Sequence, residues 1–288
     1  MYTLGSNTLK SYGVRVTSCR GLLDFTERKE IDNFSYFDTD GEEPYTDSDM
    51  ILFRERTIDL TCFYRAATGS FLTGWDTFIT LLKSSGLKNF PSPYSSHTHS
   101  VYVSEPFDVT EVSRRTAAYR AFTFRLRLTE PVPDDFSTYT PTPISATTDI
   151  WAMDGYSLKD SFGIKIEKCE GLYDMPALKK YPTFNNIFVN GDRSWTGSDN
   201  LHYESRDLKL YGYLVQDSSQ DAVDQFNSFK WLLFQENMRI LNVPGDNNIF
   251  NVYCKNGGTA EMLKGHSSKF IIRFILNLKY VNNIDYGT

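Results

Sequence analysis

The sequence has few cysteines, no long apolar run and no concentrated run of basic residues. Its four cysteines, Cys19, Cys62, Cys169 and Cys254, stand far apart without a Cys-x-x-Cys pair. This usage favours reduced, buried thiols over a disulfide framework or a zinc site. No 18 apolar residues run together and the N-terminus lacks a signal-peptide pattern, so we expect neither a membrane span nor a secretion signal.

The charge balance is acidic, with 36 Asp and Glu against 30 Lys and Arg. Tight binding to a phosphate backbone needs a concentrated basic face, and the basic residues here cluster only in short pairs. We therefore do not expect nucleic-acid binding to be the main task. The 40% hydrophobic and 15% aromatic residues in a chain of 288 are enough for two buried cores.

The chain resembles itself at a shift of 150 residues. Residues 13–63 and 163–213 share 13 identities in 51 ungapped positions, and the match resumes where 122–128 lies over 272–278. Self-similarity at one fixed shift indicates a duplicated folding unit. We predict one copy over residues 1–130, a stiff Pro/Thr/Ser-rich linker over 131–150 and a second copy over 151–288.

Twelve residues recur at equivalent positions, and we predict structural roles for them. They are Gly13, Cys19, Gly21, Asp24, Gly41 and Arg56 in the first copy, and Gly163, Cys169, Gly171, Asp174, Gly191 and Arg206 in the second. The glycines of Asp-Gly and Asn-Gly pairs suit hairpin turns. For each Asp and Arg we favour an internal ion pair that orients a loop over a repeated binding contact, and for the recurring cysteine we favour packing over reactivity.

Hydrophobic periodicity predicts the same elements in both copies. Alternation predicts strands at 14–16 and 164–166, 58–62 and 208–212, 101–103 and 252–254, and a long final strand over 270–280. Apolar residues at helical spacing predict one helix per copy, through Trp75, Phe78, Ile79 and Leu82 and through Ala222, Phe226, Phe229 and Leu233. Asp217-Ser-Ser would cap the second helix.

The resulting fold class is mostly β (α+β), with two tandem β-sandwich or barrel domains and one flanking helix in each. In the final strand, Ile271 and Ile275 share a face with polar residues. We expect that partly apolar face to be covered by a neighbouring sheet or subunit.

No constellation of residues supports catalysis. His97-Thr-His99 has metal-compatible spacing, but no third ligand is evident nearby and the Pro/Ser-rich context favours a solvated loop. The acidic stretch 38–43 lacks the terminal glutamate of a calcium loop, and 256–259 lacks the features of a phosphate cradle. We predict no catalytic residue, no metal and no cofactor, and hence no enzyme.

The order of motifs resembles a known family. Phe162-Gly-Ile-Lys-Ile166, the turn Gly171-Leu-Tyr-Asp-Met-Pro176, a hairpin at Asn190-Gly191, Tyr203-x-x-Arg206, a helix and a closing strand are similar to the distal tail and tail-tube proteins of tailed bacteriophages. The first copy shows the same order, but has Thr26 where the second has Pro176.

The resemblance implies domains of tail-tube type that assemble into rings around a DNA channel. The leading expectation is a distal tail (hub or baseplate) protein whose ring joins the tail tube to the tail tip, and the alternative is a major tail-tube protein stacked as pseudo-hexameric rings. Its partners would be itself, as a pseudo-sixfold trimer or a hexamer, together with tube, hub and tape-measure proteins. DNA would pass without specific binding along an acidic wall. The location would be the virion tail, after synthesis in the host bacterial cytoplasm.

A carbohydrate- or receptor-binding β-protein is a third, less favoured reading. Its basis is the aromatic content and the loops that hold Tyr45, Trp195 and Trp151. Aromatic rings that stack on sugars must be exposed, and we expect Tyr45 and Trp195, beside a hairpin, to be packed or at an interface.

Overall fold

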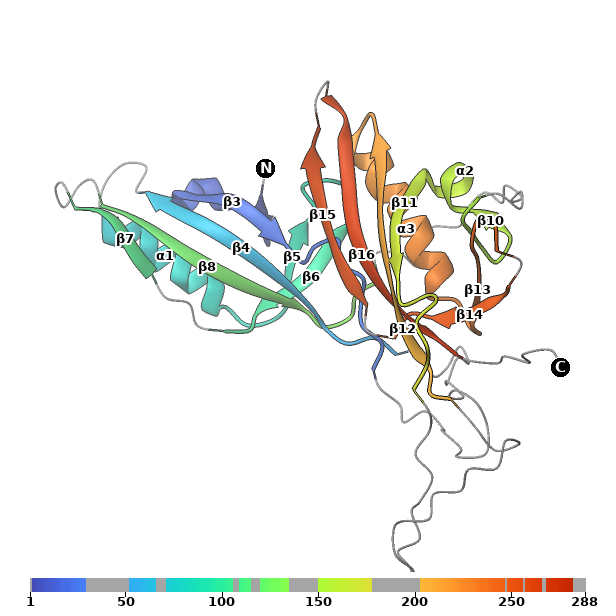
Figure 1. The fold of residues 1–288 in the computed structure, drawn as a ribbon. Helices are drawn as coiled ribbons and strands as arrows, with labels where there is room; N and C mark the ends of the chain where they lie inside the picture. The colour runs from blue at the N-terminus through green and yellow to red at the C-terminus, as the bar shows by residue number, and fades with distance from the viewer. Residues whose placement is uncertain are drawn as a thin grey trace, which may run out of the picture.

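A computed structural model of the chain shows two antiparallel β-sheets side by side, each with a helix on one face (Figure 1). The mostly β fold class is therefore confirmed. No helix within the described part of the chain is long and apolar enough to cross a membrane. The structure describes residues 2–29, 52–65, 71–105, 109–114, 120–134, 150–177, 203–246, 248–255, 257–265 and 268–281.

The first unit, residues 2–134 as described, is built on a six-stranded sheet. Its order is β3 (Val14–Arg20), β4 (Arg56–Arg65), β8 (Arg120–Glu130), β6 (Thr98–Val103) and β5 (Lys88–Pro91), with β7 (Val109–Arg114) also paired to β8. Helix α1 (Phe71–Lys83) packs on this sheet. The pair β1 (Thr3–Leu4) and β2 (Asn7–Thr8) and the 3-10 helix η1 (Leu9–Tyr12) precede β3.

The second unit, residues 150–281 as described, has an eight-stranded sheet. Its order is β10 (Tyr156–Ser157), β9 (Ala152–Met153), β13 (Arg239–Asn242), β14 (Phe250–Tyr253), β16 (Phe270–Tyr280), β12 (Arg206–Gln216) and β11 (Ile164–Glu170), with β15 (Gly258–Lys264) also paired to β16. Its helices are α2 (Leu158–Phe162) and α3 (Ser219–Leu233).

The two sheets repeat one topology in detail. Leu60 pairs with Leu126 and Leu210 with Leu276, both at the shift of 150 residues. The irregularity in β3 lies between residues 16 and 18, and that in β11 lies between 166 and 168. The boundaries 1–130, 131–150 and 151–288 stay a prediction, and residues 135–149 of the expected linker lie outside the described part.

Alternating burial explains why each helix covers only one face. In β4, every second residue from Arg56 to Tyr64 is buried, and α1 packs on that face through buried Phe78 and Leu82. In the second unit, Ser218 caps α3 by accepting a hydrogen bond from the Asp221 amide at 3.0 Å. Both expected helices are confirmed. The extra helix α2 has only five residues, too few to show a periodic stripe.

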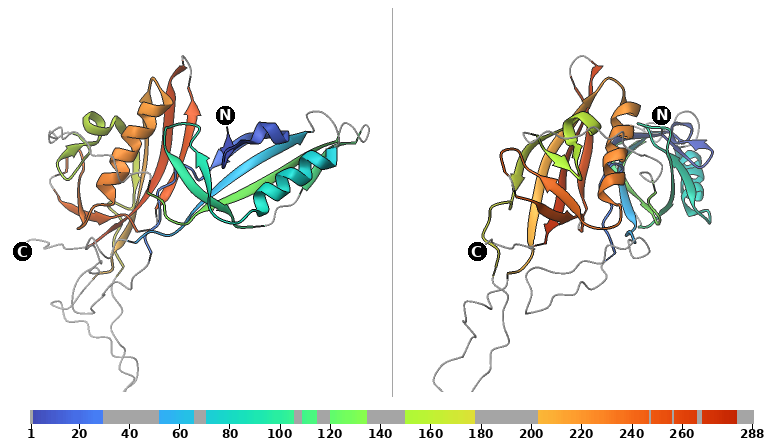
Figure 2. Two further views of the ribbon diagram at one scale, coloured as in Figure 1. Left: turned by 180° about the vertical axis from the view of Figure 1, so that it is seen from behind. Right: turned by 90° about the vertical axis from the view of Figure 1, so that its right-hand side faces the viewer.

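Both long helices lie on the same side of the molecule, behind the sheets in Figure 1 and in front of them in the left view of Figure 2. Among the described residues, the opposite sheet faces carry no helix. Their basic residues are Arg15, Arg20, Arg65, Arg125, Arg127, Lys165, Lys168, Lys209, Arg273 and Lys279, and their acidic residues are Asp59, Glu167, Glu170, Asp207 and Glu261. The uncovered faces are therefore locally basic in a chain that is acidic overall.

Two of the recurring glycines directly follow β3 and β11, the first long strand of each unit. Gly21 has φ +85°, and a Cβ there would lie 2.1 Å from the Thr57 carbonyl oxygen. Gly171 has φ +82°, and its Cβ would lie 2.2 Å from the Asp207 oxygen. A left-handed backbone and direct contact with a neighbouring strand both require glycine at these positions.

We expect Gly21→Ala and Gly171→Ala each to lower the free energy of unfolding by about 3 kcal/mol or more, because backbone strain adds to a clash with a rigid carbonyl. Gly86→Ala is the matched control, since Gly86 also has φ +85° but nothing lies within 4 Å of its added Cβ. It should cost only about 1–2 kcal/mol. Urea unfolding measures all three, and equal losses would show that the clash is unimportant.

Candidate functional site: the contact between the two units

The recurring residues are placed as follows. Gly13 and Gly163 end η1 and α2 with positive φ, and Cys19 and Cys169 lie half-buried near the ends of β3 and β11. Trp151 packs against the core of the second unit. Outside the described residues lie Gly41, Gly191, the acidic stretch 38–43, Tyr45 and Trp195.

The expected Asp–Arg ion pairs stay a prediction, and the recurring arginines also bind backbone carbonyls: burial raises the pKa of Asp24, while the charge of Arg56 acts in the opposite direction. Arg56 donates from Nη1 to the Leu22 carbonyl at 3.0 Å, and its Nε lies 3.0 Å from Oε2 of Glu130. Arg206 likewise donates to a backbone oxygen, that of Asp174. Each guanidinium thus orients the loop that follows β3 or β11 through a backbone carbonyl, that of Leu22 in the first unit and that of Asp174 in the second.

The loop after β3, residues 21–29, crosses to the second unit, and we call it the docking segment. The Phe25 amide donates to the Gly258 carbonyl at 3.0 Å, and Oδ1 of Asp24 accepts from the Ala260 amide at 2.7 Å. Both partners lie on β15, which pairs with β16 on one side and, among the described residues, forms the edge of the sheet on the other. The docking segment therefore satisfies backbone donors and acceptors that an edge strand leaves open.

The side chain of Phe25 is the apolar anchor of this contact. It is 3% exposed, and its ring centroid lies 5.1 Å from that of Phe226, 5.7 Å from Phe274 and 6.3 Å from Phe229. The Phe226 and Phe274 contacts are edge-on, a favourable aromatic geometry. Burying one such ring stabilises by about 1.5–3 kcal/mol. Leu23 is also buried in this core.

Two buried cationic side chains take part in the contact between the units. Arg28 donates from Nη2 to the Leu233 carbonyl at the C-terminal end of α3, at 3.4 Å, where the helix dipole favours a positive charge. Lys230 places Nζ 6.0 Å from the Phe25 ring centroid and 5.2 Å from that of Phe226. A cation over an aromatic face is attracted by the ring quadrupole, so charge and apolar packing act together here.

A groove of about 800 Å³ remains between the two units. One wall is β3 with the start of the docking segment, and the other is β15 with residues 273–275 of β16. Figure 1 shows β15 at the side of the second sheet that faces the first unit. Ile275 lines this groove, so its face is partly covered by the other sheet, as the sequence led us to expect.

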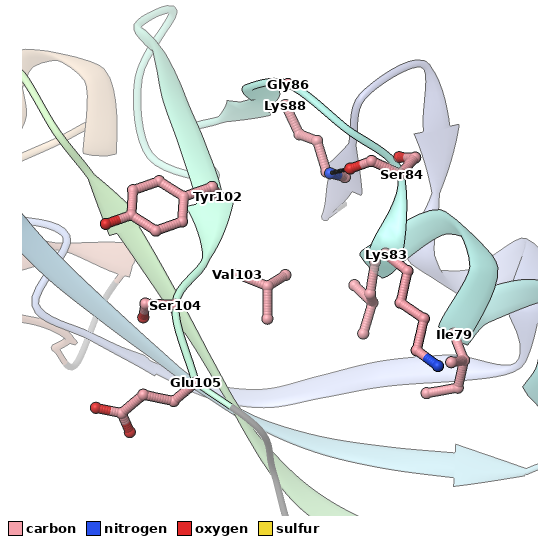
Figure 3. A pocket seen from close by; sticks show the side chains of 10 residues that line it. Ile79, Lys83, Ser84, Gly86, Lys88, Tyr102, Val103, Ser104 and Glu105 are labelled. Atoms are coloured by element: carbon pink, nitrogen blue, oxygen red, sulfur yellow. Dashed lines mark hydrogen bonds between the residues drawn. The ribbon is translucent and has the colours of Figure 1, made fainter.

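A second hollow, of about 460 Å³, lies between the end of α1 and β6. Figure 3 shows that its charged groups do not converge, because Lys83 and Glu105 point in different directions. Lys88 donates from Nζ to the Ser84 carbonyl at 2.7 Å and is thereby occupied with the end of the helix. This hollow offers no set of groups that would orient a ligand.

The expected solvated loop at the two histidines is wrong for His99, which is 2% exposed in β6. The ligand atoms of His97, His99 and Glu130 all lie within 4.8 Å of one another. Nδ1 of His99 lies 3.0 Å from Oε1 of Glu130, whose other oxygen meets Arg56. Because this guanidinium already neutralises the carboxylate and repels cations, we interpret the cluster as a buried ion-pair network.

The cysteines have unreactive thiols. Burial raises the pKa of Cys19, Cys62 and Cys254 to about 12 and that of Cys169 to about 11. Since the thiolate is the nucleophile, these side chains act as packing groups. The expectation of full burial holds for Cys62 and Cys254, whereas the other two are half-buried.

No family model and no curated protein matches this chain. Among solved structures, it is similar to the SPP1 Dit protein (gp 19.1), described as a paradigm of the hub adsorption apparatus in phages that infect Gram-positive bacteria. The alignment covers 96% of this chain and 99% of that one, with 11% identity and a TM-score of 0.30. At these values the likeness decides no question of function by itself.

The contact predicts an unusual pH effect at Asp24. Burial raises the pKa of Asp24, although the hydrogen bond from the Ala260 amide acts in the opposite direction. The protonated carboxyl is therefore favoured in the folded state. The contribution of Asp24 to stability is full below the unfolded pKa and is lost as pH rises through the folded pKa. Asp24→Asn keeps an acceptor without the charge. We expect it to be at least as stable as the wild type at pH 7, with the advantage gone at pH 3.

Asp24→Ala is the control, because it removes the acceptor and leaves the Ala260 amide without its side-chain partner. It should lose about 1–3 kcal/mol at either pH. Urea unfolding at both pH values measures these differences, and an Asn variant clearly weaker than the wild type at pH 7 would contradict the assignment.

We expect Glu130→Gln to lower the free energy of unfolding by about 3–5 kcal/mol, because it removes the negative charge that lies 3.0 Å from the buried Arg56 guanidinium. Asp134→Asn is the matched control, since Asp134 lies 3.6 Å from His97 but is mostly exposed, and it should change stability by less than about 1 kcal/mol. Thermal and urea unfolding measure both, and a Gln variant as stable as the control would argue against the network.

Proposed function

We propose that this chain is a structural, non-catalytic protein of a bacteriophage tail, in the distal tail role, where a ring of its copies joins the tail tube to the tail tip. The sequence resemblance suggests the family. The single structural observation that carries the assembly is the contact between the two units, which uses different surfaces on its two sides.

A contact between like units through unlike surfaces is head-to-tail. The first unit contributes β3 and the docking segment, and the second contributes β15, α3 and β16. Head-to-tail contacts do not end with two units: they continue into a closed ring or an open filament. Three chains of two units would close a pseudo-sixfold ring, and six-unit symmetry suits a tail.

The expected acidic wall stays a prediction, and the sheet faces that carry no helix are locally basic. If these faces line a channel, DNA meets cations at them, so an acidic net charge is no guide to the lumen. A channel wall of mixed sign still fits a conduit that contacts DNA without reading its sequence.

The test is where and in how many copies the chain occurs in a virion. Antibody labelling followed by electron microscopy should place it at the junction of tube and tail tip, and quantitative mass spectrometry should give the copies of one ring. Copies sufficient for tens of stacked rings would favour the alternative, a major tail-tube protein. Absence of the chain from purified virions would contradict both roles.

A further inference from the structure

The groove between the two units is bounded by the outer edges of two sheets. Strand β3 ends the first sheet, and β15 forms an edge of the second among the described residues. Residues 17–20 of β3 and 259–262 of β15 line the groove on its two sides. A strand at the edge of a sheet has N–H and C=O groups without a partner strand. The groove therefore offers main-chain hydrogen-bonding groups as well as side chains.

The hydrogen bonds at the start of β15 show which way its backbone groups point. The Asn277 amide in β16 donates to the Gly257 carbonyl at 3.0 Å, so residue 257 faces β16. In contrast, the Gly258 carbonyl accepts from the docking segment, and the Ala260 amide donates to it. Residues 258 and 260 therefore turn their backbone groups away from β16.

The same alternation continues to the end of β15. This strand stays in register with β16 from Gly258 to Lys264, and the backbone groups of an antiparallel strand alternate between its two sides. The N–H and C=O groups of Met262 and Lys264 thus point away from β16. Among the described residues, the docking segment bonds to this edge at Gly258 and Ala260, so the edge beyond Ala260 is open.

The docking segment already adds to this edge in the manner of a short strand. Phe25 and Gly258 form an antiparallel bridge. Oδ1 of Asp24 accepts from the Ala260 amide at 2.7 Å, as the backbone carbonyl of a paired strand would. On the N-terminal side of Asp24 the chain belongs to the first sheet, through β3. A second extended segment could continue the pairing at Met262, where the docking segment leaves the edge.

Apolar and aromatic side chains lie beside the open edge. Tyr94 packs against the cores of both units, and Met262 is partly buried against the second core. Both residues line the groove. In an antiparallel pair, side chains that lie directly opposite each other share one face of the sheet. A strand paired with β15 would therefore place one side chain beside Met262, where an apolar group is favoured.

The groove suits an extended chain better than a small polar ligand. Its volume of about 800 Å³ lies within the range of roughly 300–1,000 Å³ that is typical of ligand sites. Two of its polar side chains are already engaged within the second sheet, because Arg273 donates to Glu167 at 3.3 Å and Tyr211 donates to Glu170 at 2.9 Å. The backbone of the edge remains open, and main-chain hydrogen bonds supply the affinity when a peptide adds to a sheet.

We propose that this groove binds an extended segment of a partner protein, which adds as a strand to the edge of β15 at Met262 and Lys264. An apolar side chain of that segment packs against Met262 and Tyr94. The added strand covers an edge that would otherwise be free to pair nonspecifically. The site lies within one chain and does not depend on the proposed tail role.

The first test selects peptides from a phage-displayed library of random heptapeptides on the immobilised full chain. Enriched peptides are synthesised, and their affinities are compared on the wild type, Met262→Pro and Met262→Leu. Proline removes an N–H that points away from β16, a position at which an edge strand tolerates proline. We expect it to weaken binding by about tenfold, because a hydrogen bond is lost and its acceptor is left unpaired.

Met262→Leu is the matched control, since it keeps the N–H and nearly the same side-chain volume. It should change the affinity by less than about twofold. Urea unfolding checks that both variants fold. A library that gives no enriched peptide, or enriched peptides that bind all three proteins equally, would overturn the site.

The second test needs no variant and follows amide hydrogen exchange of the wild type by NMR. In the dilute free protein, the amides of Met262 and Lys264 should exchange rapidly, whereas those of Glu261 and Leu263, which face β16, should exchange slowly. An enriched peptide at ten times its Kd should slow exchange at Met262 and Lys264 by about tenfold. Unchanged exchange at these two amides would place the peptide elsewhere and overturn the site.

Hydrogen exchange also distinguishes the other possible occupants. Protection of the Met262 amide in the dilute free protein would mean that the chain covers its own edge. Protection that rises with protein concentration would assign the groove to a second copy. Either result would overturn the binding of a partner segment. A chain that binds peptides at β15 but is absent from virions would keep the site and overturn only the tail role.

Discussion

The structure depends on the insertion of one side chain, Phe25, from the first unit into the aromatic core of the second. The docking segment that carries it leaves its own sheet, so its backbone must be satisfied elsewhere. In the edge strand β15, the Gly258 carbonyl accepts from the Phe25 amide, and the Ala260 amide donates to the Asp24 carboxylate. The hydrogen bonds to β15 and the buried Phe25 ring thus belong to the same short segment. Together they fix the orientation of the two units relative to each other.

A covalent connection changes the energetics of such a contact. Two separate units pay a large loss of translational and rotational freedom on association, whereas two units in one chain meet at a high effective concentration. In a ring of tandem chains, every second contact would lie within one chain and would therefore lose less translational and rotational entropy. The remaining contacts would depend on protein concentration, so assembly could be confined to conditions in which the other tail components are present.

Much of the fold follows from local pattern, but the contact does not. The helices of Phe78 and Phe226 and the long strand β16 were predictable because their apolar residues repeat at a regular spacing. The short elements α2, β1 and β2 carry too few residues to show a period. The burial of Phe25 and His99 was hidden because their partners, near residues 226–274 and at Glu130, are distant in sequence. Self-similarity showed which residues correspond, and it could not show that corresponding residues have different neighbours.

Divergence between the two units would give the proposed assembly its direction. If the core of the first unit received Phe25 as readily as the core of the second, first units could dock on first units of other chains and the order would be lost. The core that receives Phe25 contains Leu214, Phe226 and Ile272, whereas the corresponding residues of the first unit are the larger Tyr64, Trp75 and Phe122, so a phenylalanine inserted there would overpack the core. Overpacking and cavities both destabilise. Specificity in this head-to-tail series would therefore come from the cost of the wrong pairs as much as from the fit of the right ones.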